Sequence, residues 1–288
     1  MLWFIFAIAT ALSVATGDAL TKKFFGRFSP YDMAIASSIY NLPFLVVYIF
    51  FVPIPQLDTV FWWIACILIP LDTSAFYLYM KAIKLSPLSL SIPFLSFTPV
   101  FMILTGFLVL GEVPNRWGIM GIGFVVVGSY LLNITQLKYG YFAPFRAILK
   151  EPGSILMLVV AFIYSFLAVL GKKAIQHSSP LFFGFFYLAA LDITTLIFFP
   201  FLEKIRWKDI LKVPVKGLSV GLMLFLHALF HCLAINMIEA VYMIAVKRMS
   251  ILFSVVYGWI LFKESDISVR ILGALFMFAG VVFIILLG

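Results

Sequence analysis

Lys247 and Arg248 are adjacent cations inside an apolar run that extends from residue 239 to residue 262. A lysine or arginine at the centre of a helix in hydrocarbon costs about 2.5–3.5 kcal/mol, so both side chains should face protein or water. There they could bind an anionic group of a ligand, or they could pair with buried carboxylates as a structural network. The residue types are compatible with both roles.

The residues that share a helical face with Lys247 carry hydroxyl groups. Ser250, Ser254 and Tyr257 follow it at the spacing that puts them on one side of an uninterrupted helix. Arg248 is rotated away from that side by roughly 100°. We therefore predict a substrate-binding face made by Lys247 and the hydroxyls, with Arg248 at the edge of the cavity or against a neighbouring helix.

Four carboxylates could balance these cations. Asp72 and Asp192 lie deepest within their apolar runs, and we predict that they pair with the cations or take up coupled protons. Asp18 and Asp32 lie near the ends of their runs. They fit an interfacial position at a helix end as well as a functional one.

His227 and His231 lie on one face of another apolar run, at positions i and i+4. This spacing can bind zinc, but no acidic residue lies between them and no third ligand is evident, so we predict no metal site. Hydrogen bonding within a helix bundle, and cavity lining with proton handling, both remain open. An internal alignment described below pairs His231 with Tyr79, which we add to the substrate-binding candidates.

The run SPLSLSIPFLSFTPVF, residues 86–101, contains three prolines. Pro93 and Pro99 each remove one helical hydrogen bond and leave a carbonyl to be satisfied elsewhere. Ser89 and Ser96 share a face with Pro93. A kinked helix rich in serine is typical of a binding site or a hinge, so we predict that both serines contact substrate.

The elements that must position these residues are apolar and long. The chain has 288 residues, of which 64% are hydrophobic and 11% charged, whereas an ordinary soluble domain is about 25% charged. Its apolar runs approach the roughly 20 residues that span a bilayer. The sequence therefore predicts an all-α polytopic membrane protein with ten transmembrane helices, at about 2–21, 31–52, 59–80, 87–110, 115–134, 153–172, 180–202, 215–237, 239–262 and 267–287.

Composition and cysteine usage exclude other classes of protein. The net charge of +8 comes mostly from cations in the short gaps between apolar runs, which argues against nucleic-acid binding. Cys66 and Cys232 fall inside apolar runs, so neither a disulfide framework nor zinc-ligand spacing is present. The first run lacks a basic leader and is interpreted as a retained span.

The two halves of the chain resemble each other. Residues 82–112 align without gaps on residues 234–264, and residues 22–30 align on residues 172–180. An odd number of spans in each half requires the second half to be inverted relative to the first. We predict a first repeat at 1–137, a linker at 138–152 and a second repeat at 153–288. In this alignment Lys247 and Arg248 face Leu95 and Ser96, so the symmetry is broken at the cations.

A family resemblance rests on these repeats. Each fourth span ends in an acidic residue, in LVLGE to Glu112 and ILFKE to Glu264, and a glycine-rich fifth span follows. This pattern resembles the EamA-type proteins of the drug/metabolite transporter superfamily over essentially the whole chain. The resemblance implies alternating access, a pocket lined by helices 1–4 and 6–9, and peripheral helices 5 and 10. Glu112 and Glu264 are expected to be helix-end residues of the fold.

The function that follows is secondary transport, not catalysis, of a small organic metabolite in which an anionic group is favoured. The alternative is an exporter of aromatic or amphipathic compounds or drugs. A membrane-embedded lipid-modifying enzyme is less favoured, because no nucleophile with a base is found, and a non-transporting scaffold or insertion factor is a further alternative. We predict no cofactor. The predicted partners are the substrate, the lipid bilayer and a proton or counter-substrate. The protein is expected to be a monomer or homodimer in a prokaryotic cytoplasmic (inner) membrane.

Charge placement predicts the orientation. Lysine and arginine concentrate in the odd-numbered gaps, whereas the even-numbered gaps contain only Arg116, Lys172 and Lys173. The positive-inside rule puts the basic gaps in the cytoplasm and both termini outside, although many ten-helix relatives are thought to have the reverse arrangement.

Cysteine labelling tests this orientation. Single cysteines at Gln56 and Lys208, in a background without Cys66 and Cys232, are treated in intact cells with an impermeant thiol reagent. Labelling at position 56 and protection at position 208 are expected, because the basic gap should be cytoplasmic. The opposite labelling pattern would reverse the orientation.

Overall fold

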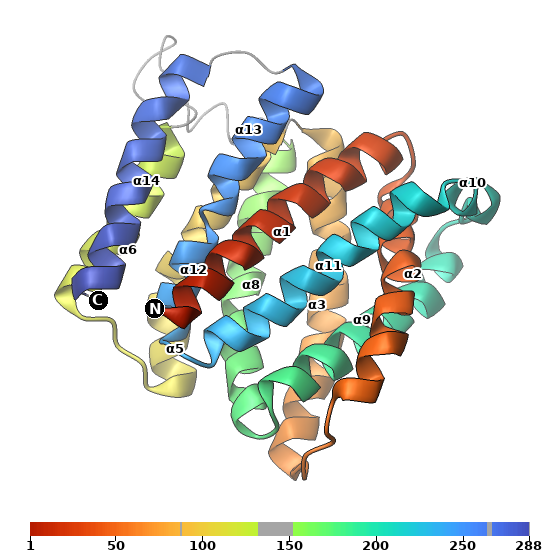
Figure 1. The fold of residues 1–288 in the computed structure, drawn as a ribbon, viewed down its shortest axis with the longest axis horizontal. Coiled ribbons are helices and arrows are strands. Elements are labelled where there is room, and N and C mark those ends of the chain that lie inside the picture. Colours follow the sequence, from red (N-terminus) through yellow and green to blue (C-terminus); the bar gives the residue numbers. More distant parts are fainter. Residues whose placement is uncertain (87, 132–151, 264–266, 288) are drawn as a thin grey trace.

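The computed structural model describes residues 1–86, 88–131, 152–263 and 267–287, and within these ranges the chain forms helices without a strand (Figure 1). The predicted linker at 138–152 lies outside the described residues except for Pro152, as does Glu264. The helices of the first half are α1 (Leu2–Phe25), α2 (Pro30–Tyr48), η1 (Ile49–Phe51), α3 (Thr59–Leu85), α4 (Leu88–Ser91), η2 (Ile92–Phe97), α5 (Thr98–Leu110) and α6 (Arg116–Leu131). Those of the second half are α8 (Pro152–Gln176), α9 (Pro180–Leu202), α10 (Trp207–Leu211), α11 (Pro214–Ile235), α12 (Ala240–Lys247), α13 (Ser250–Phe262) and α14 (Ile267–Leu287).

Seven helical segments of the described chain are long and apolar enough to cross a membrane. They are Leu2–Phe25, Pro30–Phe51, Thr59–Leu85, Pro152–Gln176, Pro180–Leu202, Pro214–Ile235 and Ala240–Phe262. Shorter apolar helices occupy Phe94–Leu110, Arg116–Gly128 and Leu275–Ile284, within the other three predicted spans. The all-helical class is confirmed, and the count of ten spans stays a prediction.

Several helices extend further than the sequence predicted. Lys22 and Lys23 lie in the last turn of α1, Lys84 in that of α3 and Lys173 in that of α8, rather than in gaps. Cations are favourable at the C-terminal end of a helix, where the backbone carbonyls carry negative partial charge. The basic residues therefore prolong these helices instead of ending them.

The two halves of the chain interleave. Helix α1 packs on α11 and α13, and α8 makes the corresponding contacts with α3 and α5, while α2 packs on α9 (Figure 1). Equivalent hydrogen bonds accompany this packing, since Lys22 Nζ donates to the Ser86 carbonyl at 2.6 Å and Lys172 Nζ to the Ile238 carbonyl at 2.7 Å. The aligned residues of the two halves thus make matching contacts.

Caps at equivalent places begin the second helix of each half. Ser29 accepts the backbone N–H of Asp32 at 3.1 Å, and Ser179 accepts that of Phe182 at 3.2 Å. A proline follows each serine at the first helical position, where its missing N–H is not needed. Asp32 completes a capping box and accepts the Arg206 N–H at 2.9 Å, which is the helix-end role considered for it.

A polar contact joins the halves outside the spans. The Asp58 carboxylate caps α3 by accepting the Phe61 N–H at 2.9 Å, and its other oxygen lies 2.6 Å from His177 Nδ1. The Phe61 N–H and the neighbouring His177 hold the pKa of the Asp58 carboxyl below its ordinary value. This pair links the start of α3 to the residue after α8.

The predicted helix at 239–262 is broken, which corrects the expectation of an uninterrupted polar face. Helix α12 ends at Lys247 and α13 begins at Ser250. Between them, the Met249 N–H bonds the Val246 carbonyl at 2.9 Å and the Ile251 N–H bonds the Arg248 carbonyl at 2.9 Å. These i to i−3 bonds tighten the turn and rotate α13 relative to α12. The aligned stretch of the first half is η2, where the break coincides with Pro93.

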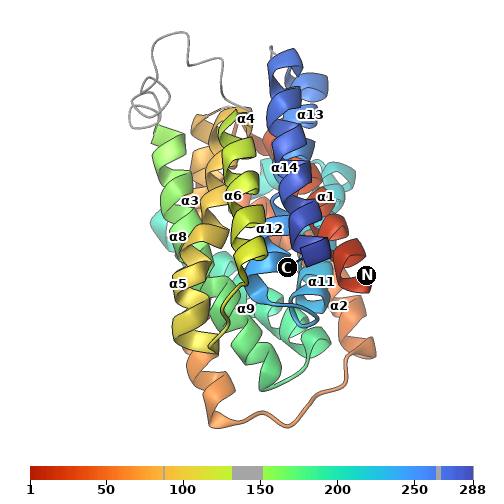
Figure 2. The same ribbon diagram turned by 90° about the vertical axis from the view of Figure 1, so that its left-hand side faces the viewer.

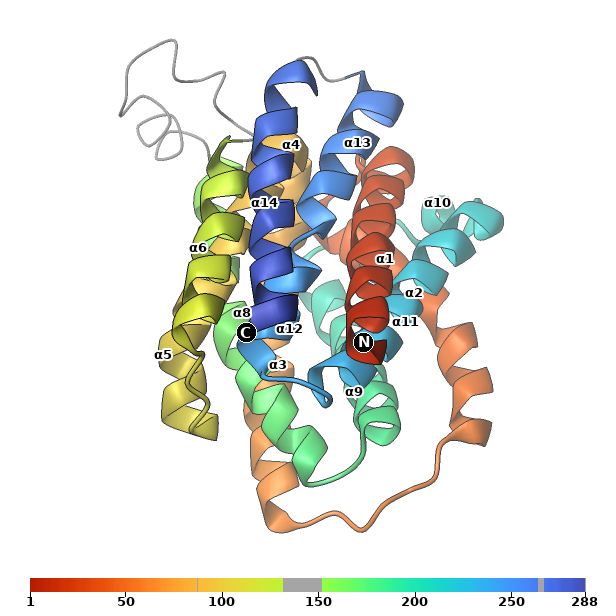
Figure 3. The ribbon, with the colours of Figure 1, turned by 60° about the vertical axis from the view of Figure 1, so that its left-hand side comes forward.

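Helices α6 and α14 lie side by side at one edge of the molecule (Figures 2 and 3). A Cβ on Gly121 would lie 2.7 Å from the Gly280 carbonyl oxygen, and one on Gly128 would lie 2.6 Å from that of Gly273. Only glycine permits so close an approach of the two backbones. These four glycines therefore form one packed seam between α6 and α14.

Alanine at Gly280 should push this seam apart. Its Cβ would lie 2.5 Å from the Gly121 oxygen, whereas a Cβ on Gly123 meets nothing within 4 Å. Gly280→Ala and Gly123→Ala each add about 0.8–1.0 kcal/mol of stability through helix propensity. Gly280→Ala should in addition lose about 1–3 kcal/mol of stability through overpacking. Thermal unfolding in detergent should give a lower midpoint for Gly280→Ala than for Gly123→Ala. Equal midpoints would contradict the close packing of α6 on α14.

Candidate functional site

A cavity of about 200 Å³ lies between the two halves of the chain. Helices α1, α2, α3, α8, α9, α11 and α12 all contribute to its wall. Apolar and aromatic side chains make most of this wall, and the polar ones come from a few positions. A largely apolar cavity with a few polar groups that point inward is the usual form of a small-molecule site.

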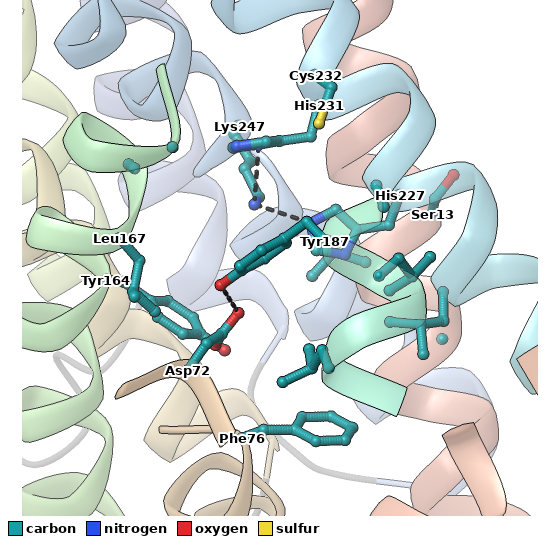
Figure 4. Close-up of a pocket in the computed structure, with 18 of the residues that line it drawn as sticks. Ser13, Asp72, Phe76, Tyr164, Leu167, Tyr187, His227, His231, Cys232 and Lys247 are labelled. Carbon is teal, nitrogen blue, oxygen red and sulfur yellow. Dashed lines mark hydrogen bonds between the residues drawn. The ribbon is translucent and has the colours of Figure 1, made fainter. Parts of the chain in front are cut away.

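Lys247 lies at one side of this cavity and is held by two histidines of α11 (Figure 4). Its Nζ is 2.8 Å from His227 Nε2 and 3.4 Å from His231 Nδ1. An ammonium can only donate hydrogen bonds, so a charged Lys247 requires unprotonated nitrogens at both positions. Two of its three N–H groups are then occupied, and the described residues provide no hydrogen-bond acceptor for the third, which leaves it for a ligand.

Arg248 adds a second cation to the same wall. Its side chain is 2% exposed, and its Nε has no hydrogen-bond partner among the described residues. A buried guanidinium that lacks one of its hydrogen bonds is costly. A ligand anion is one group that would complete its bonding.

Two carboxylates of the cavity are bound by tyrosines rather than by cations. Asp72 accepts a 2.5 Å hydrogen bond from the Tyr187 hydroxyl (Figure 4), and Asp18 accepts one of 2.5 Å from Tyr79. Within the described chain, neither carboxylate lies within 4.0 Å of a lysine, arginine or histidine nitrogen. Asp72 therefore forms no close ion pair with Lys247 or Arg248 among the described residues, and its predicted role in coupled protonation stays a prediction.

Aromatic rings line the rest of this region. Tyr79 stacks on Tyr164 with ring centroids 6.2 Å apart, and Tyr187 stacks on Phe183 at 5.1 Å. All four residues contribute to the cavity wall, together with Phe76. A planar or apolar part of a ligand would lie against these rings.

The structure brings together half of the residues singled out in the sequence. Those that line the cavity are Lys247, Arg248, Tyr79, Asp72, His227 and His231. Ser250 and Ser254 are buried outside it, and their hydroxyls have no hydrogen-bond partner among the described residues. The Tyr257 hydroxyl lies 2.8 Å from Thr16 Oγ1. The break after Lys247 explains this difference, because it rotates α13 away from the face that Lys247 occupies.

The remaining candidates also lie elsewhere. Ser96 is buried but does not line the cavity, and the side chain of Ser89 lies outside the described part of the chain. Asp192 accepts a 2.6 Å hydrogen bond from Asn41 between α2 and α9, away from both cations. Among the described residues it therefore forms no close ion pair with Lys247 or Arg248, and its predicted role in coupled protonation stays a prediction.

Asp18, Tyr164 and Tyr187 line the cavity but were not among the predicted substrate-binding or coupling residues. Asp18 was considered, and its helical spacing with Thr21, which also lines the cavity, is a signal that could have favoured it. The tyrosines gave no such signal, since aromatic residues in apolar helices also face lipid.

The start of α12 is fixed from the other half of the chain. Glu112, at the end of α5, forms an ion pair with Lys172 of α8 and accepts the N–H of Ala240 at 2.9 Å. Lys172 also donates to the Ile238 carbonyl. A carboxylate at a helix N-terminus is stabilising, and this one positions the short helix whose last residue is Lys247.

Removal of the Lys172 charge should destabilise the protein. The ion pair is mostly buried, with side-chain exposures of 9% and 18%, and breaking such a pair leaves an uncompensated charge that costs about 3 kcal/mol. Lys172→Met should lower the unfolding midpoint, whereas Lys173→Met, at the neighbouring position, should not.

The double variant Glu112→Gln/Lys172→Met separates this effect from a loss of packing. It should recover part of the lost stability, because no unpaired charge remains. A double variant that loses the sum of the two single losses would show that the pair is not coupled.

Comparison with known proteins assigns the fold. A family model described as "EamA-like transporter family" matches residues 1–134 and 151–286. A solved structure described as "Crystal structure of protein" is 14% identical, with a TM-score of 0.69 and coverage of 98% of this chain and 99% of that one. At that identity it shows a shared fold only. No curated protein matches the sequence.

Proposed function

The chain belongs to the EamA-like transporter family, and from that premise we propose that it is a secondary transporter of a small organic metabolite bearing an anionic group. The family and the apolar helices make it an integral multi-pass membrane protein of the drug/metabolite transporter type. The cargo and alternating access are the parts that we propose. A prokaryotic inner membrane and a driving force from a gradient or from exchange complete the proposal.

The position of Lys247 is the observation that carries this proposal. It lies in the wall of a cavity between the halves, at the end of a short helix, with one N–H left after its contacts with His227 and His231. Arg248 follows on the same wall. In surroundings of low dielectric constant, two cations attract an anion more strongly than they would in water.

The carboxylates of the cavity limit the charge of the cargo. Asp18 and Asp72 face the same space as the two cations, so a polyanion would meet repulsion that a monoanion avoids. A compound that carries one anionic and one cationic group would satisfy both kinds of side chain. We therefore favour a monoanion or a zwitterion over a polyanion.

The aromatic wall supports the second candidate function, export of aromatic or amphipathic compounds. Tyr79, Tyr164, Phe183 and Tyr187 present rings to the cavity. An aromatic compound without an anionic group would use these rings and leave the cations unused. Ligand charge therefore distinguishes the two functions.

Substitution of Lys247 tests the proposal. Lys247→Gln should weaken the best anionic ligand of a metabolite panel by about 1.5–3 kcal/mol, the strength of a hydrogen bond to a charged group. Lys247→Arg should retain part of the affinity, because it keeps the charge in a different shape. Ligand-induced shifts of the unfolding midpoint, followed by uptake into proteoliposomes, give the readout.

Lys84→Gln is the matched control, since it removes an exposed lysine at the end of α3. It should bind the ligand as tightly as the wild type. A folded Lys247→Gln protein with unchanged anion affinity, or a panel in which only uncharged or cationic compounds bind, would overturn the proposal.

A further inference from the structure

A second group of buried polar residues lies outside the cavity, between α2 and α9. Ser38 and Asn41 are one turn apart on α2, and Asp192 and Thr195 are one turn apart on α9. All four residues have an exposed fraction of 0%. We call these four residues the α2–α9 polar cluster.

Most side-chain oxygens of this cluster lack a hydrogen-bond partner among the described residues. Asn41 Nδ2 donates to Asp192 Oδ2 at 2.6 Å. Four other oxygens have no hydrogen-bond partner among the described residues, namely Ser38 Oγ, Asn41 Oδ1, Asp192 Oδ1 and Thr195 Oγ1. The Ser38 side chain on α2 also lies close enough to Asp192 on α9 to act on its carboxylate. Buried polar atoms are normally paired, so four orphaned oxygens on two facing helices require an explanation.

No protein cation balances Asp192. Within the described chain, none of the ion pairs includes this carboxylate, and Lys247 and Arg248 face the cavity, which Asp192 does not line. A buried ionised carboxylate with a single N–H donor is costly. A bound cation would supply the missing charge and would contact the orphaned oxygens together.

The ligand set indicates which cation. All four free atoms are oxygens of carboxylate, amide and hydroxyl groups, which suit hard cations. One carboxylate neutralises a monovalent ion, whereas calcium and magnesium sites usually combine more charge or several waters. Pro43 cannot donate the N–H that an uninterrupted helix would give to the Ile39 carbonyl, on the turn of α2 that carries Ser38 and Asn41. We propose that the α2–α9 polar cluster binds a sodium ion, with Asp192 as its anionic ligand.

The cluster adjoins the wall of the cavity. Ser37 and Leu191, the sequence neighbours of Ser38 and Asp192, both line the cavity. Occupation of the cluster therefore fixes two helices that also contact the cargo. If the proposed transport function holds, this ion would link cargo binding to a sodium gradient. Sodium binding itself does not depend on that function.

Sodium binding can be measured without a cargo. The full-length protein in detergent is unfolded by heat in sodium chloride, potassium chloride or N-methyl-D-glucamine chloride at equal ionic strength. Sodium should raise the unfolding midpoint by about 2–4 °C relative to N-methyl-D-glucamine. Binding of radioactive sodium to the same sample gives the stoichiometry directly.

Variants of the cluster locate the ion. Asp192→Asn keeps the volume and removes the charge, so it should abolish both the sodium shift and sodium binding. Thr195→Val removes one ligand and should reduce the shift, whereas Thr194→Val, at the adjacent and half-buried position, should leave it unchanged. Thr195→Val keeps the test valid if Asp192→Asn fails to fold.

Three results would overturn the inference. The first is an equal midpoint in all three salts with no bound sodium. The second is a sodium shift that persists in folded Asp192→Asn. The third is a midpoint that depends on pH but not on the cation, which would identify a protonated hydrogen-bond cluster instead. Sodium binding without transport of any anion would uphold this site and contradict only the proposed function.

Discussion

The contact of the Lys247 ammonium with the imidazoles of His227 and His231 constrains the centre of the molecule. Hydrocarbon offers no water to a charge, so a lysine at this depth persists only where protein atoms replace its hydration shell. Two neutral nitrogens of α11 do so in part. The remaining N–H and the adjacent Arg248 leave an electropositive side in a cavity that is otherwise apolar and aromatic. The need to solvate this charge ties α12 to α11.

The pseudosymmetry of the fold explains how that charge is positioned. Matching lysines bind matching carbonyls in the two halves, at Ser86 and Ile238, and the chain is broken at matching places, in η2 and after α12. Glu112 of the first half also anchors the start of α12 in the second half, through Lys172 and Ala240. The break in the first half contains Pro93, whereas the corresponding break in the second half lies at Lys247 and Arg248. The departure from symmetry therefore coincides with the residues that we assign to the cargo.

The sequence was sufficient for the helical class, the two repeats and the position of Lys247 in a cavity wall, because apolar runs and a misplaced charge are local signals. The sequence did not predict the helix break after Lys247, since no proline or glycine marks that position. Because of this break, Ser250, Ser254 and Tyr257 do not share the face of Lys247 that was predicted. Tyr164 and Tyr187 could not be distinguished from lipid-facing aromatics. The partners of Asp72 and Asp192 were also out of reach, because Tyr187 and Asn41 lie more than one hundred residues away along the chain.

A structure determined with the anionic compound that most stabilises the protein would test the central claim most directly. The account predicts that the anionic group lies between α11 and α12, within hydrogen-bond distance of Lys247 Nζ, with the rest of the compound against the rings of Tyr79, Tyr164 and Tyr187. A compound bound elsewhere, with Lys247 still in contact with both histidines and the cavity unoccupied, would contradict it.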